Sequence, residues 1–362
     1  MKHFSFRHSV SFLAIVFSFI SCTSEDRETP IDPPPLSGDY SNGVFILNEG
    51  NFGSVNASVS FLDESDQVFG NIFSNVNSAN LGDTAQSMGF NGDNAYIVVN
   101  NSATVEVVNR NTFDRIATVT DMLVNPRYIV FSGNNGYISN WGDPNNINDD
   151  YIAVLNLETN LVESTISVVE GPERLLINNG KLYVAHKGGF GYGNTISVID
   201  LEAQNVIESI PVADVPDGLV ITNGSLYVTC TGKLPFTQDE TIGGIFKIDT
   251  ADATVESSLM FPEGIHPNSL EYINNTLYYT VENAMFNIKI SNFQLPSAPL
   301  FEASDNGLEI LYGFNVHNGN IYVADAKDYI SNGEVFIYSL DGVLQNQFNV
   351  AIIPNSFYFN NL

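Results

Sequence analysis

The fold can be recognised from residues 219–233, which read LVITNGSLYVTCTGK. In this segment two runs rich in β-branched and apolar residues flank the pair Asn223-Gly224. An Asn-Gly pair between such runs is the strongest short-range signal for a β-hairpin, because both turn residues must tolerate a positive φ. The same pattern recurs at 87–101, 128–142, 175–189, 270–284 and 314–328. We therefore expect the chain to be built from repeated hairpins.

The repeats are regularly spaced. The aromatic anchors Tyr96, Tyr137, Tyr183, Tyr227, Tyr278 and Tyr322 are separated by 41, 46, 44, 51 and 44 residues. A further alternating strand follows the hairpins at 105–112, 151–159, 196–204, 244–252 and 334–342, and an outermost strand such as 206–212 comes after a polar turn. Periods in the forties with about four short strands in each repeat indicate propeller blades.

The two ends of the chain supply a blade that completes the ring. Residues 44–63 look like the second and third strands of a blade, whereas 353–360 look like a first strand with no blade after it. Pairing these ends gives a seventh blade and removes exposed sheet edges. We therefore expect an all-β fold, a seven-bladed β-propeller with four-stranded antiparallel blades, as one domain over residues 43–362. An open solenoid and a pair of β-sandwiches are the alternatives.

The amino terminus has the pattern of an export signal. Residues 1–21 carry Lys2 and Arg7 before an apolar run that is too short to span a bilayer, as in a secretory signal peptide. The run ends at Ser21-Cys22, which resembles the bacterial lipobox and predicts lipidation of Cys22; an incidental cysteine is the alternative. Residues 22–42 are acidic and proline-rich, which is typical of an extended tether. Acidic residues directly after such a cysteine resemble the surface-export signal of Bacteroidetes lipoproteins, so we expect an outer-membrane protein facing outward.

Charge and cysteine content exclude several functions. The chain has 13 Lys and Arg against 41 Asp and Glu, a formal charge of −28, and loss of two cations with the signal gives 11 minus 41, or −30. Nucleic-acid binding requires Lys and Arg side chains that neutralise phosphates. Docking on anionic lipid requires basic side chains as well. We therefore expect no nucleic-acid partner and contact with the membrane only through the lipid. Cys230 is the only cysteine in the sequence besides Cys22, so the mature fold cannot contain a framework of internal disulfides.

One face of the propeller is the predicted binding site. In a four-stranded blade, the loops between the second and third strands and the junctions between blades emerge on the same face. Aromatic, amide and charged residues gather in these segments, as expected for a site that takes a large organic ligand. The predicted ligand contacts are Asn51, Phe52, Asn101, Arg127, Trp141, Arg174, His186, Lys187, Phe190, Tyr192, Lys233, Phe236, His266, Tyr312, Lys327 and Tyr329.

Two groups in this set have alternative interpretations. Trp141, the single tryptophan, either stacks on the ligand or caps the core of its blade. The five cations of the set are nearly half of the 11 that the mature chain carries, which suggests an anionic group on the ligand. Ion pairs with Glu49, Glu173 or Asp217 would explain the same cations.

Motifs for catalysis are largely missing from the sequence. No nucleophile elbow or phosphate-binding glycine loop is present, and the histidines do not show the spacing of a zinc site. Residues 143–150 are rich in oxygen ligands for Ca²⁺, but their spacing departs from an EF-hand loop, which favours a solvated acidic loop. We expect a protein that is not an enzyme, with no required cofactor and no bound metal.

The blade repeats 226–232 and 196–212 look like the YVTN-type repeats of the YncE family. Together with the lipobox and residues 44–63, they make the mature chain resemble the Bacteroidetes surface lipoprotein propellers, and in particular the BtuG-like cobalamin-binding lipoproteins. The resemblance implies capture of cobalamin or another corrinoid and its transfer to a BtuB-like, TonB-dependent outer-membrane transporter. A propeller lyase or lactonase using His266 or Ca²⁺, and an adhesion protein without a small ligand, are the alternatives.

Overall fold

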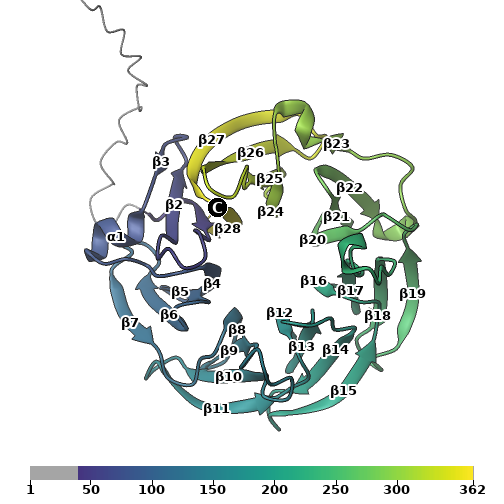
Figure 1. Ribbon diagram of the computed structural model, residues 1–362, viewed down its shortest axis with the longest axis horizontal. Coiled ribbons are helices and arrows are strands. Elements are labelled where there is room, and N and C mark those ends of the chain that lie inside the picture. The colour runs from purple at the N-terminus through teal and green to yellow at the C-terminus, as the bar shows by residue number, and fades with distance from the viewer. Residues whose placement is uncertain (1–39, 362) are drawn as a thin grey trace, which may run out of the picture. The chain divides into compact units, whose positions relative to one another are not determined.

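The computed structural model describes residues 40–361, which form seven four-stranded antiparallel sheets arranged around a central axis (Figure 1). The innermost strand of each sheet faces the axis, and the outermost strand lies on the circumference. This is the predicted seven-bladed β-propeller. The predicted signal peptide at 1–21, the lipidation site Cys22 and all but three residues of the predicted tether at 22–42 lie outside the described residues.

Each blade is given from its innermost to its outermost strand. The first three blades are β4 (Ala85–Asn91), β5 (Asn94–Val99), β6 (Thr104–Asn109) and β7 (Arg115–Val119); β8 (Pro126–Ser132), β9 (Asn135–Asn140), β10 (Tyr151–Asn156) and β11 (Leu161–Ser167); and β12 (Pro172–Asn178), β13 (Lys181–His186), β14 (Thr195–Asp200) and β15 (Asn205–Pro211). The next three are β16 (Pro216–Thr222), β17 (Ser225–Cys230), β18 (Gly244–Asp249) and β19 (Val255–Met260); β20 (Pro267–Ile273), β21 (Thr276–Val281), β22 (Ala284–Lys289) and β23 (Phe301–Glu302); and β24 (Leu311–His317), β25 (Asn320–Asp325), β26 (Asn332–Ser339) and β27 (Leu344–Ile352). The seventh is β28 (Pro354–Asn360), β1 (Gly43–Asn48), β2 (Ser58–Asp63) and β3 (Val68–Phe69). The short helices are α1 (Ile72–Asn77) and the 3₁₀ turns η1 (Pro235–Thr237), η2 (Ile290–Asn292) and η3 (Ala303–Asn306).

The hairpin turns have the predicted backbone conformation. Asn223 and Gly224, between β16 and β17, have φ of 50° and 78°, and Asn318 and Gly319, between β24 and β25, have φ of 45° and 83°. Two consecutive residues with positive φ match the twist of the strands that they join, and Asn and Gly tolerate this conformation best. The recurring Asn-Gly pairs therefore fix the first two strands of these blades locally.

The chain closes its ring as predicted, by pairing its two ends. The carboxyl-terminal strand β28 runs antiparallel to β1, with Val44 opposite Phe359 and Ile46 opposite Phe357. The hydrogen bonds between β28 and β1 thus hold both ends of the chain. Without this pairing, each strand would expose an edge of unpaired backbone groups.

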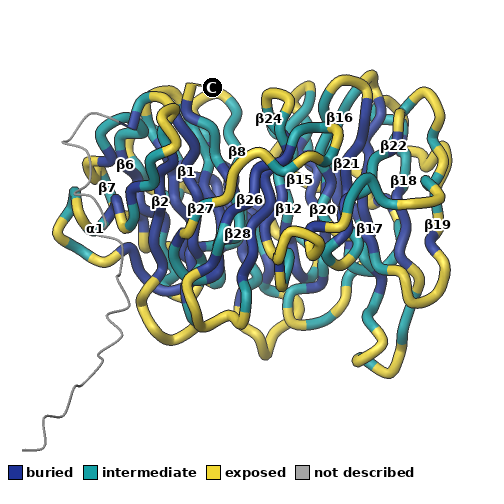
Figure 2. Tube along the Cα trace, turned by 90° about the horizontal axis from the view of Figure 1, so that it is seen from above, coloured by how far each residue is buried: buried dark blue, intermediate teal, exposed yellow. Residues whose placement is uncertain are grey.

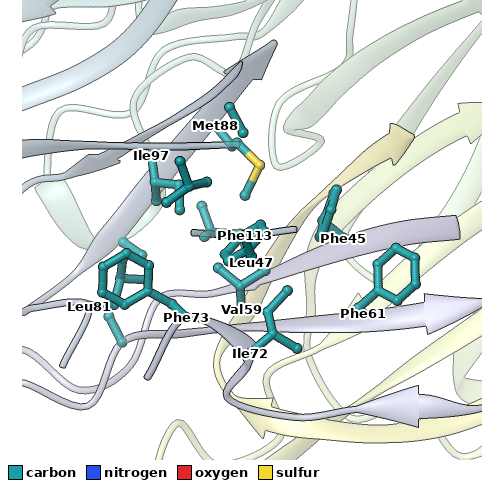
Figure 3. Close-up of a cluster of buried hydrophobic side chains, with 14 of the residues drawn as sticks. Phe45, Leu47, Val59, Phe61, Ile72, Phe73, Leu81, Met88, Ile97 and Phe113 are labelled. Atoms are coloured by element: carbon teal, nitrogen blue, oxygen red, sulfur yellow. The ribbon is translucent and has the colours of Figure 1, made fainter. Parts of the chain in front are cut away.

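Hydrophobic side chains fill the space between neighbouring blades. In the cluster of Figure 3, Phe45 and Phe61 from the closing blade contact each other with ring centroids 5.0 Å apart, and Phe113 of the next blade lies 5.1 Å from Phe45. Tyr40 is fully buried in the same cluster, 5.3 Å from Phe61. The folded region therefore already includes Tyr40, which corrects the predicted start at residue 43.

Helix α1, which the sequence pattern did not indicate, belongs to the same cluster. It lies between β3 and β4, and its Ile72 and Phe73 are fully buried.

Among the described residues, no helix has the length and apolar character needed to cross a membrane.

Because successive strands alternate in direction, all loops from second to third strands and all junctions between blades lie on one face. We call this face the rim. Figure 2 shows exposed loops along both edges of the ring, with mostly buried strands between them. The rim carries long loops, including 141–150, 187–194 and 231–243.

Candidate functional site

The innermost strands carry polar side chains at their rim ends, around the opening of the central axis, which we call the mouth of the axis. Each of them has an irregularity in its register close to the rim, where residues bulge out of the ladder. Bulges re-aim side chains and often occur beside functional sites. The bulged residues include Gln86, Arg127, Tyr128, Glu173, Arg174, Asp217, Tyr312 and Asn355.

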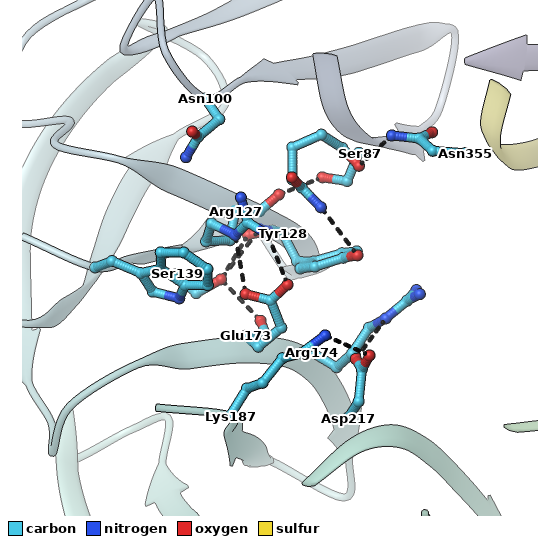
Figure 4. A network of polar contacts seen from close by, with 12 residues as sticks. Ser87, Asn100, Arg127, Tyr128, Ser139, Glu173, Arg174, Lys187, Asp217 and Asn355 are labelled. Carbon is cyan, nitrogen blue, oxygen red and sulfur yellow. Dashed lines mark hydrogen bonds and ion pairs between the residues drawn. The ribbon is translucent and has the colours of Figure 1, made fainter. Parts of the chain in front are cut away.

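Arg127 and Trp141 form a fixed unit at this mouth, and Figure 4 shows the ion pair of Arg127 with Glu173. The Arg127 guanidinium donates two hydrogen bonds of 2.9 Å to the carboxylate of Glu173, and its carbon lies 3.9 Å from the centroid of the Trp141 ring. The indole Nε1–H donates to the carbonyl of Pro172 at 3.1 Å. The ring of Phe190 meets the indole edge-on at 5.6 Å. Trp141 is therefore half-buried and held in place by Arg127, Pro172 and Phe190.

Arg174 and Lys187 share one carboxylate. Arg174 Nε donates to Asp217 Oδ1 at 3.2 Å, and Lys187 Nζ donates to Asp217 Oδ2 at 3.0 Å. Desolvation raises the pKa of the Asp217 carboxyl, but the Lys187 and Arg174 cations outweigh it and hold that pKa well below its ordinary value. The Tyr128 ring lies under the Arg174 guanidinium at 4.4 Å, and burial raises the pKa of the Tyr128 hydroxyl to about 12.

The other predicted cations are also paired. Lys233 Nζ lies 2.7 Å from Asp239 Oδ2, and Lys327 Nζ lies 2.9 Å from Glu334 Oε1. All five cations of the predicted site thus have an acidic partner within the chain. Glu173 and Asp217 are among the partners that the ion-pairing interpretation named, whereas Asp239 and Glu334 are not. The scarcity of cations in the sequence does not by itself identify a ligand contact.

A second group lies where the sixth and seventh blades meet. Tyr312 Oη donates to Glu49 Oε2 at 2.9 Å, and the Tyr312 and Tyr329 rings meet edge-on at 5.7 Å. Asn51 Nδ2 donates to the carbonyl of Tyr329. Burial is the main cause that raises the pKa of the Glu49 carboxyl. Glu49, which the sequence analysis considered only as an ion-pair partner, is instead the hydrogen-bond acceptor that orients Tyr312.

The exposed aromatic side chains are concentrated on the rim. Among the described residues, six aromatic side chains are largely exposed, and all six belong to rim loops or to the rim end of β24: Phe52, Phe190, Tyr192, Phe236, Tyr312 and Tyr329. Phe52 and Phe236 keep 79% and 77% of their surface exposed. Burial of such surface is the main source of free energy in binding an organic molecule.

Two of the predicted contacts are not available at the surface. His186 is 0% exposed, and its Nε2 lies 2.8 Å from Ser197 Oγ on the neighbouring strand β14. Its burial lowers the pKa of the imidazole to about 4. The side chain points across its sheet and not toward the loop that follows it, which corrects its predicted place on the rim surface.

His266 is largely covered as well. Its Nδ1 lies 2.8 Å from the carbonyl oxygen of Thr231, and its Nε2 lies 3.3 Å from Glu240 Oε1. Asn101, by contrast, remains in a rim loop, where its Nδ2 donates to Asp83 Oδ2 at 2.7 Å.

The acidic loop 143–150 uses its carboxylates for its own turns. Asp149 Oδ2 accepts the backbone N–H of Asp143 at 3.1 Å, and Asp143 Oδ1 accepts that of Asn145 at 2.9 Å. Within residues 40–361, no three His, Cys, Asp or Glu side chains are grouped so that they could hold a metal ion.

The fold and this face define a seven-bladed propeller with an aromatic rim around a polar axis mouth. Residues 42–353 match the model of the DUF5074 family, described as a domain of unknown function, and the chain belongs to that family. No curated protein sequence matches the chain.

Solved structures share the fold at low sequence identity. A quinonprotein alcohol dehydrogenase-like protein from Bacteroides thetaiotaomicron has a TM-score of 0.65 at 15% identity, over 89% of this chain and 79% of that one. A functionally unknown protein from Desulfotomaculum acetoxidans has a TM-score of 0.63 at 11% identity, over 88% and 99%. The dihydro-heme d1 dehydrogenase NirN, solved in complex with DHE, has a TM-score of 0.58 at 11% identity, over 91% and 77%. These similarities establish the propeller and nothing of its ligand.

Proposed function

We propose that the rim captures a bulky organic ligand without changing it chemically, and that the leading ligand is cobalamin or another corrinoid. The observation that carries the proposal is the gathering of all six exposed aromatic side chains of the described region on one face. Large exposed apolar surface on one side of a folded domain is typical of a binding site.

The polar groups of the rim suit a ligand that is itself rich in amides. Asn51 and Asn101 lie in the loops beside the exposed rings, and both have spare hydrogen-bonding capacity in their carboxamides. Cobalamin is a wide ring that carries several amides and one phosphate, so it offers partners both to the aromatic surface and to the amides. The ligand would lie across the rim and cover the mouth of the axis.

We further propose that Cys22 carries a lipid that holds the protein on the outer-membrane surface, and that a BtuB-like, TonB-dependent transporter receives the ligand. These proposals rest on the sequence resemblance. They are tested by labelling of Cys22 with a fatty-acid probe and by co-purification of the transporter from outer membranes. An unlabelled protein, or a preparation without any transporter, would contradict them.

The single tryptophan offers a direct test of ligand capture. Trp141 lies on the rim, so quenching of its fluorescence on addition of cyanocobalamin reports binding at this face. Isothermal titration should show binding at micromolar concentrations. Replacing both Phe52 and Phe236 by alanine should weaken it about tenfold or more, as loss of aromatic anchors does. The matched control is Ile207→Ala, which removes exposed apolar surface from the outer strand β15.

Two results would contradict the proposal. One is the absence of heat and of quenching with cyanocobalamin. The other is equal binding by the double rim variant and the wild type. Chromatography of the recovered cobalamin adds a check on the mechanism, since a changed product would indicate an enzyme and not a capture protein.

A further inference from the structure

We infer that the Arg174 guanidinium is the binding point for an oxyanion, a phosphate ester or a carboxylate, carried by the ligand that the rim captures. The inference deepens the proposed function by assigning a chemical group to one position of the site. It rests on how Arg174 differs from the other rim cations.

Arg174 is only partly used by the protein. Its Nε donates to Asp217, but within residues 40–361 neither terminal nitrogen has a hydrogen bond or an ion pair. Its side chain keeps 43% of its surface exposed, although it belongs to the innermost strand β12. Figure 4 shows the end of the side chain pointing away from the pair formed by Arg127 and Glu173. Two amino groups are therefore presented to the mouth of the axis.

Arg127 is the internal comparison. It occupies the bulge of the preceding blade, but both its Nε and its Nη2 are bonded to Glu173, and its side chain is only 13% exposed. The fork formed by Nε and Nη2 of Arg127 is therefore occupied, and its guanidinium is stacked on the Trp141 ring. Carboxylates and phosphates are bound by two parallel N–H groups of one guanidinium. Of these two arginines, only Arg174 has both terminal nitrogens without a partner in residues 40–361.

The free fork is held in place and carries excess charge. The Tyr128 ring supports the guanidinium from one side, and Asp217 fixes its Nε. Asp217 is shared with Lys187, so two cations face one carboxylate and the group keeps one net positive charge. On a chain with a formal charge of −28, such a spot attracts an anion that the rest of the surface repels.

Two further carboxyl groups lie near Arg174, and neither forms an ion pair with it. Glu173 is neutralised by its bidentate pair with Arg127. Glu271, on the innermost strand β20, accepts a hydrogen bond from Asn315 Nδ2 at 3.0 Å and forms no ion pair with Arg174 within 4.0 Å. An oxyanion at the axis mouth would thus find in Arg174 two terminal nitrogens that no carboxylate of residues 40–361 occupies.

The test uses small aromatic probes and the mature protein. Phenyl phosphate, benzoate and neutral benzamide are titrated while Trp141 fluorescence and calorimetry are followed. The wild type should bind phenyl phosphate or benzoate better than benzamide, and which anion binds better distinguishes a phosphate from a carboxylate site. Arg174→Gln should weaken anion binding about tenfold or more and leave benzamide unchanged, since a charge-assisted hydrogen bond is lost.

Two further variants keep the test decisive. Arg174→Lys retains the charge but not the fork, and it should bind the anions less well than the wild type. Lys247→Gln, which removes a cation paired with Glu256 away from the rim, should have no effect. Equal anion binding by wild type and Arg174→Gln, with both folded by circular dichroism, would overturn the inference. Cobalamin binding that survives this result leaves the proposed function intact, whereas anion binding without cobalamin binding rejects cobalamin and keeps the oxyanion site.

Discussion

Glu271 should make the stability of the propeller depend on pH. Its carboxyl group lies on β20 beside Asn315, and Arg174 is the cation that acts on it. Desolvation by the surrounding strands is the largest influence and raises the pKa of Glu271 from 4.5 to about 7, against the smaller effects of Arg174 and Asn315. The folded protein therefore holds this proton more tightly than the unfolded chain does. The stability that the Glu271 proton contributes is fully present below about pH 4.5 and is lost as the pH rises through about 7.

The size of the effect follows from the two pKa values. The step from 4.5 to about 7 is worth about 3.5 kcal/mol, at about 1.4 kcal/mol for each factor of ten. The side chain is only partly covered, so contact with water along the axis reduces the effect to about 1–2 kcal/mol. Glu271→Gln removes the charge and keeps an oxygen that accepts the hydrogen bond from Asn315. At pH 8 this variant should be more stable than the wild type, and at pH 4.5 the two should be alike.

Thermal unfolding followed by circular dichroism at pH 4.5, 6, 7 and 8 measures this difference. A change of 1–2 kcal/mol corresponds to a rise of about 2–4 °C in the melting temperature of Glu271→Gln at pH 8. The control Glu263→Gln removes a carboxylate from an exposed junction and should follow the wild type. A Glu271→Gln variant that melts with the wild type at every pH, or below it at pH 8, would refute the reasoning.

Three further predictions concern the ring closure, the rim and the buried thiol. Phe357→Ala should lower the free energy of unfolding by about 3–5 kcal/mol in urea titrations, because the ring is buried where β28 pairs with β1; an unchanged midpoint would contradict this. Trp141→Phe should cost about 1 kcal/mol of stability by loss of the bond to Pro172 and should abolish the tryptophan emission, and a larger loss would show that the indole supports the whole loop. Cys230 should react with a thiol reagent only after denaturation, since burial raises the pKa of its thiol and covers its sulfur; fast labelling of the native protein would disprove this.

Local signals account for most of the correct predictions from the sequence. A hairpin is specified by a turn such as Asn223-Gly224 and the alternation around it, so the strands and their number can be recognised within a few residues. The closing blade was predictable because no innermost strand precedes the hairpin of β1 and β2, and no second strand follows β28. Tyr40 was missed since a single buried residue next to a polar segment carries no periodicity.

The chemistry of the rim could be located from the sequence but not resolved. Residues of the blade junctions were assigned to this face correctly, yet Arg127 and Glu173 are 46 residues apart, and Arg174 and Asp217 are 43 apart. These separations are close to one repeat, and opposite charges one repeat apart at a blade junction are the signal that could have revealed the pairs. His186 was misplaced because the last residue of a strand can point either into the sheet packing or toward the loop.

The sequence by itself determined the blades, their number and the way the ring closes, because hairpins and missing strands are properties of neighbouring residues. Only the tertiary structure decided which of the two rim arginines, Arg127 and Arg174, has its fork occupied and which has it open. That outcome depends on how adjacent blades stack, which brings Glu173 onto Arg127 by two hydrogen bonds but gives Arg174 a single bond to a carboxylate that it shares with Lys187.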